Sequence, residues 1–140
     1  MPEAAECPFC RIRDGGEPSH VVMDEADVLA FLDQRPVFPG HVLVIPRDHY
    51  ETLADLPVAL VGPLFCAAQR VSAAVITAMS ADGSFVAVNN VVSQSVPHLH
   101  VHVVPRRRKD GLRGFFWPRQ RYASEVDMAA TAARIRELLA

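Results

Sequence analysis

Half of the six histidines lie in one short segment, HLHVHVV, which spans residues 98–104. Successive side chains of a β-strand point to opposite faces of the sheet. The alternation therefore predicts a strand over residues 98–104, with His98, His100 and His102 on one face and the aliphatic side chains toward the core. That face supports two kinds of chemistry. Neighbouring imidazoles can share a metal ion, and a neutral imidazole is itself a nucleophile that forms covalent intermediates, here with phosphorus.

The residues just before this triad favour the second chemistry. Gln94 and Ser95 place an amide and a hydroxyl, together with backbone N–H groups, beside the imidazoles. Neutral donors of this kind are suited to holding phosphate oxygens. An imidazole with an ordinary pKa, about 6.5, is mostly neutral at pH 7, so it needs orientation and charge stabilisation rather than a metal. We therefore expect phosphorus chemistry that requires no cofactor.

Two further motifs accompany the triad: CPFC at residues 7–10 and PGHVLVIP at residues 39–46. Together with QSVPHLHVH at residues 94–102, they stand in the order found in the histidine triad (HIT) family of nucleotide hydrolases and transferases. The sequence resembles that family over residues 7–10, 30–49 and 89–106. The resemblance implies a homodimer of HIT fold that acts at the α-phosphorus of a purine nucleotide. The substrate would be a nucleoside phosphoramidate or a dinucleoside polyphosphate, and the sequence does not separate these two branches.

The resemblance also implies a role for each matching residue. His100 matches the nucleophile that forms a nucleotidyl-histidine, His102 its phosphate-facing neighbour, and His41 the residue that supports the nucleophilic ring. Ser95 matches a position that touches the phosphates and the leaving group, and Asp33 matches the acid that hydrogen-bonds the ribose hydroxyls. The residues that match nucleotide-binding positions are Asp33, Asn89, Gln94, Ser95 and His102.

Cys7 and Cys10 have the spacing of zinc ligands, but no second CxxC follows, so histidines would have to complete a site. In a branch of the HIT family such a pair binds structural zinc together with the residues that match His49 and His98. Two alternatives stay open. One is a thioredoxin-like redox pair, although too few residues precede Cys7 to form the strand that such a motif follows; the other is two inert cysteines. Cys66 is expected to lie in the core.

Composition limits the other classes of function. The 140 residues carry 14 basic and 16 acidic side chains, a formal net charge of −2, which argues against binding to nucleic acid or to anionic membranes through overall charge. An apolar content of 50% is enough for a hydrophobic core, and no apolar run is expected to reach the roughly 18 residues of a membrane span. Three cysteines and an N-terminus without signal-peptide features favour the cytoplasm.

The remaining sequence predicts an α+β fold of about five antiparallel strands, one long helix and a C-terminal helix. A single domain is expected over residues 1–140, with residues 107–140 as an extension that packs on it or on a partner subunit. The predicted strands cover residues 21–23, 28–32, 41–45, 85–89 and 98–104. The long helix is expected over residues 57–79, with the apolar stripe Leu60, Val61, Leu64, Phe65, Ala68, Val71, Val75, Ile76 and Met79 buried.

The C-terminal helix and the aromatic residues before it carry the last expectations. Ser124 and Asp127 can form a capping box for this helix, whose apolar side would hold Met128, Ile135, Leu138 and Leu139. Trp117 is expected to contact or border the other subunit. Two rival functions remain: a zinc-stabilised nucleotide-binding module with little turnover, and a zinc hydrolase that uses all three triad histidines as ligands.

Overall fold

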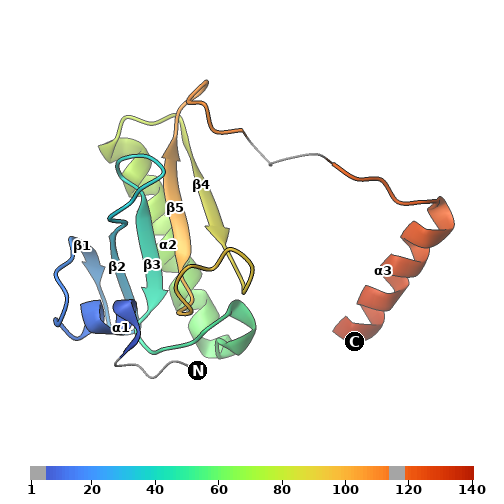
Figure 1. Cartoon of the computed structure of the whole chain (residues 1–140), viewed down its shortest axis with the longest axis horizontal. Helices are drawn as coiled ribbons and strands as arrows, with labels where there is room; N and C mark the ends of the chain where they lie inside the picture. Colours follow the sequence, from blue (N-terminus) through green and yellow to red (C-terminus); the bar gives the residue numbers. More distant parts are fainter. Residues whose placement is uncertain (1–5, 114–118) are drawn as a thin grey trace. The chain divides into compact units, whose positions relative to one another are not determined.

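The computed structural model describes residues 6–113 and 119–140, and it divides into two compact units, Met1–Asp110 and Gly111–Ala140. The first unit holds a five-stranded sheet and two α-helices (Figure 1). Its elements are α1 (Pro8–Arg13), β1 (Val21–Asp24), β2 (Val28–Leu32), β3 (Val42–Pro46), the 3-10 helix η2 (Leu53–Asp55), α2 (Val58–Ala78), β4 (Gly83–Val88) and β5 (Val101–Arg106). The second unit holds α3 (Glu125–Leu139).

The sheet has the strand order β1-β2-β3-β5-β4, and every neighbouring pair is antiparallel. The predicted fold class is therefore confirmed. β5, which carries the end of the histidine triad, is an inner strand between β3 and β4. This position fixes its register on both sides, since His102 lies opposite Leu43 of β3 and Ala87 of β4.

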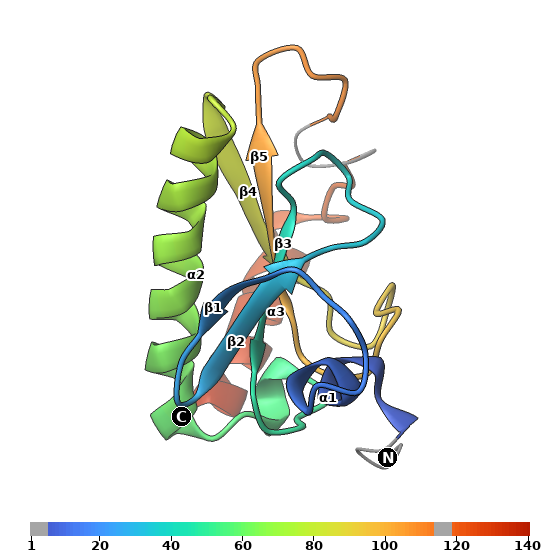
Figure 2. The same cartoon turned by 90° about the vertical axis from the view of Figure 1, so that its left-hand side faces the viewer.

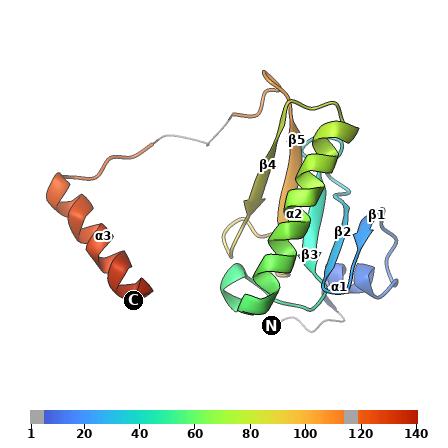
Figure 3. The same ribbon diagram turned by 180° about the vertical axis from the view of Figure 1, so that it is seen from behind.

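The two faces of the sheet are covered by different elements. α2 packs along one face (Figure 3), where its buried residues meet Leu99, Val101 and Val103 in the larger core. The short helix α1 lies on the opposite face (Figure 2). There it contributes Phe9 to a smaller cluster with Phe31 and other residues of β2 and β3. The candidate functional side chains lie on this second face.

β5 begins three residues later than predicted, at Val101 rather than His98. Its ladder with β3 ends at the pair Val44 and Val101, and the Leu99 N–H donates to the Tyr50 carbonyl instead of to a neighbouring strand. The predicted alternation nevertheless continues into this extended segment, because Leu99 is fully buried against α2. His98 and His100 therefore precede the strand.

The buried stripe of α2 is narrower than predicted. Its buried residues are Leu64, Ala67, Ala68, Val71 and Val75. Val61 and Phe65 are instead exposed, and so is Cys66, which was expected in the core. The reason is geometric: Val61 and Phe65 share a helical face with Ser72, which hydrogen-bonds Ser84 of the edge strand β4, so this face lies at the border of the sheet.

α2 also corrects the expectation about apolar length. By length and composition alone the 21 residues of this helix are sufficient to cross a membrane. In the sequence, Pro63 and Arg70 interrupt this apolar run, but the helix continues through both residues. Its buried side packs on the sheet, as in the core helix of a folded domain.

The second unit is a single helix, considered by itself. Ser124 is the N-cap of α3, and its hydroxyl accepts the backbone N–H of Asp127 at 3.1 Å, as the capping motif predicts. Within this helix as described, no residue is buried; Met128, Ile135, Leu138 and Leu139 are all exposed. Trp117 lies outside the described residues.

Candidate active site and candidate metal centre

A cavity of about 410 Å³ opens on the sheet face that carries α1. Its floor is a row across three strands, because Phe31 pairs with Leu43 and Leu43 pairs with His102 in the sheet register. Phe9 and other residues of α1 form one wall. The cavity is lined by Pro8, Phe9, Arg11, Ile12, Glu17, Ser19, Phe31, Leu32, Asp33, Gln34, Arg35, Leu43, Ser95, Val96, His100 and His102. It thus joins an apolar slot to a group of polar side chains.

His100 lies at this cavity with one ring nitrogen committed to the backbone. Its Nδ1 is 2.7 Å from the carbonyl oxygen of His98, and a carbonyl only accepts, so Nδ1 carries the proton and donates. Nε2 of the neutral ring is therefore left with a lone pair. The ring is held edge-on to Phe9, with the centroids 5.1 Å apart and an interplanar angle of 87°. Burial lowers the pKa of His100, although the carbonyl hydrogen bond and Asp33 oppose that shift, and the ring stays neutral at pH 7.

His102 lies beside His100, with ring centroids 4.8 Å apart. Its Nδ1 is 3.0 Å from Nε2 of His41, so the nitrogen available to a ligand in the cavity is Nε2. Burial, together with the charges of His100 and His41, lowers the pKa of His102 to about 4, and Asp33 only partly opposes this shift. His102 is therefore neutral over the whole physiological range.

His41 and Asp33 lie on either side of the loop between β2 and β3. His41 is buried behind His102 and does not line the cavity, whereas Asp33 does. Asp33 Oδ1 accepts the Arg35 backbone N–H at 2.9 Å, and Oδ2 is 3.7 Å from His41 Nδ1. Burial lowers the pKa of His41, and the nearby carboxylate only partly offsets this effect. The sequence did not indicate that these two residues meet.

Ser95 lines the cavity as expected, but the described lining does not include Gln94 or Asn89. The Gln94 side chain has partners inside and outside its own loop: its Oε1 accepts the Val91 N–H at 3.0 Å, and its Nε2 donates to the Glu51 carbonyl, in the segment after β3, at 2.6 Å. Asn89 is half-buried at the end of β4. The Gln94 side chain therefore holds the loop that presents Ser95, and nucleotide contact by Gln94 or Asn89 stays a prediction.

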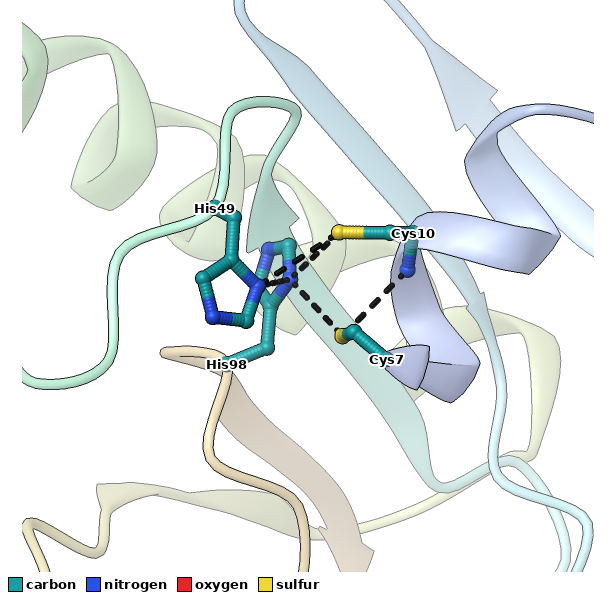
Figure 4. A group of neighbouring side chains, drawn as sticks. All are labelled: Cys7, Cys10, His49 and His98. Carbon is teal, nitrogen blue, oxygen red and sulfur yellow. Dashed lines mark hydrogen bonds between the residues drawn. The ribbon is translucent and has the colours of Figure 1, made fainter. Parts of the chain in front are cut away.

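Four metal-ligating side chains meet at the other end of the triad (Figure 4). Cys7 and Cys10 come from α1 and the residue before it, His49 follows β3, and His98 precedes β5. All four ligand atoms lie within 4.8 Å of one another. The four residues predicted as metal ligands are thus brought together, from three segments far apart in the chain.

The spacing of these atoms can be compared with a tetrahedral metal site. The two Nδ1 atoms of His49 and His98 are 3.2 Å apart, and the three close sulfur–nitrogen distances are 3.4, 3.4 and 3.5 Å. Bond lengths of about 2.05 Å for nitrogen and 2.3 Å for sulfur give tetrahedral edges of about 3.3 Å between nitrogens and about 3.6 Å between nitrogen and sulfur. The side chains fit a single ion of this size.

The surroundings of the cluster also suit a metal. His98 Nε2 donates to the Pro46 carbonyl at 2.9 Å, which leaves Nδ1 with the lone pair that a metal ligand requires. Burial and, second, the neighbouring Cys7 raise the pKa of the Cys10 thiol to about 11. Burial thus favours the neutral thiol, whereas a bound metal ion lowers the pKa of a coordinating thiol and favours the thiolate. The two buried cysteines therefore need a cation beside them to be thiolates.

The triad is thus divided between two sites. The His98 ring faces the cysteines, whereas His100 and His102 face the cavity, so the three imidazoles do not converge on one ion. A second group of ligand-type atoms, from Asp33, His41 and His102, also lies within 4.8 Å. In that group, however, the His41–His102 hydrogen bond already uses the two facing ring nitrogens.

The sequence interpretation missed the apolar half of the cavity. Phe9 lies between the two cysteines of CPFC, and Phe31 and Leu43 lie in strands that are buried on both faces. Continuous burial hides which alternate residues face a ligand. One signal was available. The strands that carry PGHVLVIP and QSVPHLHVH pair with each other, and in this pairing Leu43 lies opposite His102.

The family model of the HIT domain matches residues 14–109 of this chain. The chain belongs to the HIT family. An uncharacterized HIT-like protein of Saccharolobus solfataricus is 36% identical over 122 residues, which cover 85% of this chain and 88% of that protein. The adenosine 5'-monophosphoramidase of Saccharomyces cerevisiae is 34% identical, over 97% of this chain and 82% of that protein.

Other HIT relatives add a second activity and solved folds. The asymmetrical bis(5'-nucleosyl)-tetraphosphatase of Schizosaccharomyces pombe is 37% identical over 58% of this chain and 46% of its own length. The crystal structure of a HIT protein from Bacillus subtilis superposes with a TM-score of 0.88, at 33% identity, over 96% of this chain and 98% of that one. A zinc-bound histidine triad protein from Mycobacterium smegmatis has a TM-score of 0.74 at 34% identity, with 96% and 99% coverage.

Proposed function

We propose that this HIT protein is a nucleotide hydrolase or transferase that cleaves at the α-phosphorus through a nucleotidyl-histidine on His100. The observation that carries this proposal is the hydrogen bond from His100 Nδ1 to the His98 carbonyl. It fixes the ring so that the Nε2 lone pair is available at a cavity that also holds Ser95 and His102. The named activities of the yeast relatives, on a nucleoside phosphoramidate and on a dinucleoside tetraphosphate, support the same reaction class.

The proposed reaction is a double displacement. The His100 Nε2 lone pair forms a bond to the α-phosphorus while the bond from phosphorus to the leaving group breaks, and the leaving group departs with its electron pair and gains a proton. Water then attacks the same phosphorus and loses a proton, the bond between phosphorus and His100 Nε2 breaks with its electron pair returning to the nitrogen, and the nucleoside monophosphate leaves. Another nucleophile in place of water would give transfer. Splitting one difficult displacement into two is the general advantage of a covalent intermediate.

The cavity composition supports a nucleoside as the carrier of that phosphorus. Phe9, Phe31 and Leu43 provide apolar surfaces suited to a planar base, and Asp33 provides a carboxylate suited to ribose hydroxyls. The volume of about 410 Å³ lies in the range of small-molecule sites. A purine nucleotide is the proposed substrate, and the leaving group is an amine or a nucleoside polyphosphate.

Zinc is the proposed occupant of the cluster formed by Cys7, Cys10, His49 and His98. Two sulfur and two nitrogen ligands with tetrahedral spacing are the donor set that zinc prefers in closed structural sites. The zinc-bound relative from Mycobacterium smegmatis supports this assignment. When bound, the ion would hold α1 against the segment that leads into β5. Because His98 faces the cluster and not the cavity, the ion would take no part in the chemistry.

A homodimer is proposed on the outer edge of β4. In the described part of the chain the strand order ends at β4, and Val86 on this strand is exposed. Val61 and Phe65 of α2 border the same edge through the face that carries the Ser72–Ser84 hydrogen bond. An unpaired strand beside exposed apolar side chains is a common site of subunit pairing. Sedimentation at micromolar concentration should give a dimer, and a Phe65→Glu variant should shift it to monomer.

One experiment separates the proposed activity from its rivals. Purified protein is incubated with adenosine phosphoramidate and with diadenosine tetraphosphate, with and without a chelator, and release of adenosine monophosphate is followed. Turnover that resists the chelator in a protein that stays folded supports the covalent route. Turnover that disappears on metal removal while the fold survives supports a zinc hydrolase. Tight binding of the nucleotide without turnover supports the binding module. Either of the last two results would overturn the proposal.

A further inference from the structure

The buried ring of His41 connects the cavity to a backbone amide in the loop between β2 and β3. His41 Nε2 is 3.0 Å from Nδ1 of His102, and His41 Nδ1 accepts the backbone N–H of Val37 at 3.1 Å. Only 3% of the His41 side chain is exposed, so water does not compete for these bonds. The three groups form a chain from Val37 through His41 to the cavity-lining residue His102.

The position of each proton in this chain follows from the amide. A backbone N–H can only donate, so His41 Nδ1 must be the acceptor and carries no hydrogen. The proton of the neutral His41 ring is then on Nε2 and is donated to His102 Nδ1. His102 in turn must carry its own proton on Nε2, the nitrogen available to the cavity. Burial, which lowers the pKa values of His41 and His102, favours the neutral forms that this chain requires.

Asp33 does not compete with the amide for His41. Its Oδ2 is 3.7 Å from His41 Nδ1, beyond hydrogen-bond distance, and its Oδ1 is held by the Arg35 backbone N–H at 2.9 Å. The carboxylate therefore acts on the ring through its charge. The backbone N–H of Val37 therefore decides which nitrogen of His41 is the hydrogen-bond acceptor.

We propose that Val37, through its backbone N–H, and His41 are positioning residues that lock His102 as a hydrogen-bond donor toward the phosphate or leaving group of a bound nucleotide. This inference rests on the proposed function and deepens it. The two adjacent rings then differ in polarity: His100 offers a lone pair at Nε2, and His102 offers an N–H. With the opposite tautomer, His102 would turn a second lone pair toward anionic phosphate oxygens and repel them. A donor fixed before substrate binds needs no rearrangement during the reaction.

The test reads the ring tautomers directly, without substrate. Long-range proton–nitrogen NMR spectra of protein labelled with ¹⁵N-histidine distinguish a ring protonated at Nδ1 from one protonated at Nε2. We expect Nε2 protonation for His41 and His102 and Nδ1 protonation for His100. A wild-type His102 that is protonated at Nδ1, or that averages between the two forms, would overturn the inference.

A matched pair of variants then tests the role of the amide. Val37→Pro removes the N–H, whereas Val37→Ala keeps it and shortens a side chain that is half-exposed. Relative to Val37→Ala, we expect Val37→Pro to lose the single tautomer at His41 and His102 and to lower kcat by about 10- to 100-fold, with a smaller change in KM. Unchanged tautomers in a folded Val37→Pro protein would contradict the inference.

A second variant covers a failure of Val37→Pro to fold. His41→Phe keeps an aromatic ring in the buried position but removes the donor to His102, so the His102 signals should average between tautomers. A single Nε2 tautomer that persists in His41→Phe would overturn the inference. The proposed function is tested separately: absence of turnover in wild-type protein with the expected tautomers would refute that function, whereas turnover with a mixed His102 tautomer would refute only the lock.

Discussion

His98 and His100 are two residues apart, yet backbone hydrogen bonds fix their neutral rings in opposite tautomers. His98 donates from Nε2 to the Pro46 carbonyl and turns the lone pair of Nδ1 toward two cysteines. His100 donates from Nδ1 to the His98 carbonyl and leaves the lone pair of Nε2 at the cavity. In the proposed function the same side chain therefore serves as a metal ligand in one place and as a nucleophile in the other. The carbonyl that each ring finds decides which nitrogen is free.

The largest expected effect comes from removing the free nitrogen at the cavity. His100→Ala should lower kcat by about 10⁴-fold or more, because loss of a covalent nucleophile removes the route itself. The assay is release of adenosine monophosphate from adenosine phosphoramidate. His20→Ala, which removes an exposed imidazole, is the matched control. Comparable activity in the two variants would show that His100 is not the nucleophile.

Removing a ligand at the other end should affect stability and leave the chemistry largely intact. Cys7→Ser should lower the free energy of unfolding by roughly 3 kcal/mol or more through loss of the metal. Cys7 is also the N-cap of α1, but serine is a favourable N-cap, so the loss reports the ligand and not the cap. The measurement is chemical denaturation together with metal content.

Cys66→Ser is the control for that experiment, because Cys66 is a free and exposed thiol. Equal free energies of unfolding for Cys7→Ser and Cys66→Ser would contradict a structural metal at Cys7. A folded Cys7→Ser protein whose kcat falls as far as that of His100→Ala would break the division into two sites.

The pH dependence of the free energy of unfolding tests whether His102 is a buried neutral ring at the cavity. The folded pKa of His102 is lowered to about 4, mainly by burial, whereas an unfolded imidazole titrates near 6.5. As the pH falls, His102 is therefore protonated in the unfolded chain before it is protonated in the folded protein. The contribution of this ring to stability is complete above pH 6.5 and is lost as the pH falls from 6.5 to about 4. His102→Gln should unfold with a weaker pH dependence over that window in denaturant titrations, and an unchanged dependence would contradict the burial of a neutral ring.

The smallest effect concerns the loop that presents Ser95. Val91 and Ser93 have φ values of 68° and 62°, a left-handed region that is costly for a β-branched residue. Val91→Gly should therefore stabilise the protein by about 1 kcal/mol in denaturant unfolding. Val92→Gly is the control, since Val92 is equally exposed and has no such φ value. A destabilised Val91→Gly protein would contradict the strain.

Much of the fold was predictable from the sequence because the patterns were local. Alternation marked the triad segment, short apolar runs marked strands such as β3, the spacing of apolar residues marked α2, and Ser124 marked the start of α3. Exposure was less predictable. Val61 and Phe65 fit the apolar stripe of α2 but border the outer edge of β4, and helical spacing alone does not show where the sheet ends.

Most polar residues of the candidate sites were predictable, but the apolar lining of the cavity and the hydrogen bonds between the residues were not. The four ligands of the metal cluster and the cavity positions of His100, His102, Ser95 and Asp33 match the expected set. The Val37 amide on His41 and the engagement of Gln94 by Glu51 were not foreseeable, because both depend on how loops close in space. The motifs themselves do not specify how these loops close.

The stereochemical course at phosphorus tests the central claim most directly. The substrate is an adenosine phosphorothioate derivative that is chiral at the α-phosphorus, cleaved in isotopically labelled water. Two successive displacements, first by His100 and then by water, each invert the phosphorus, so the account predicts net retention. Net inversion would mean a single attack by water and would contradict a covalent nucleotidyl-histidine.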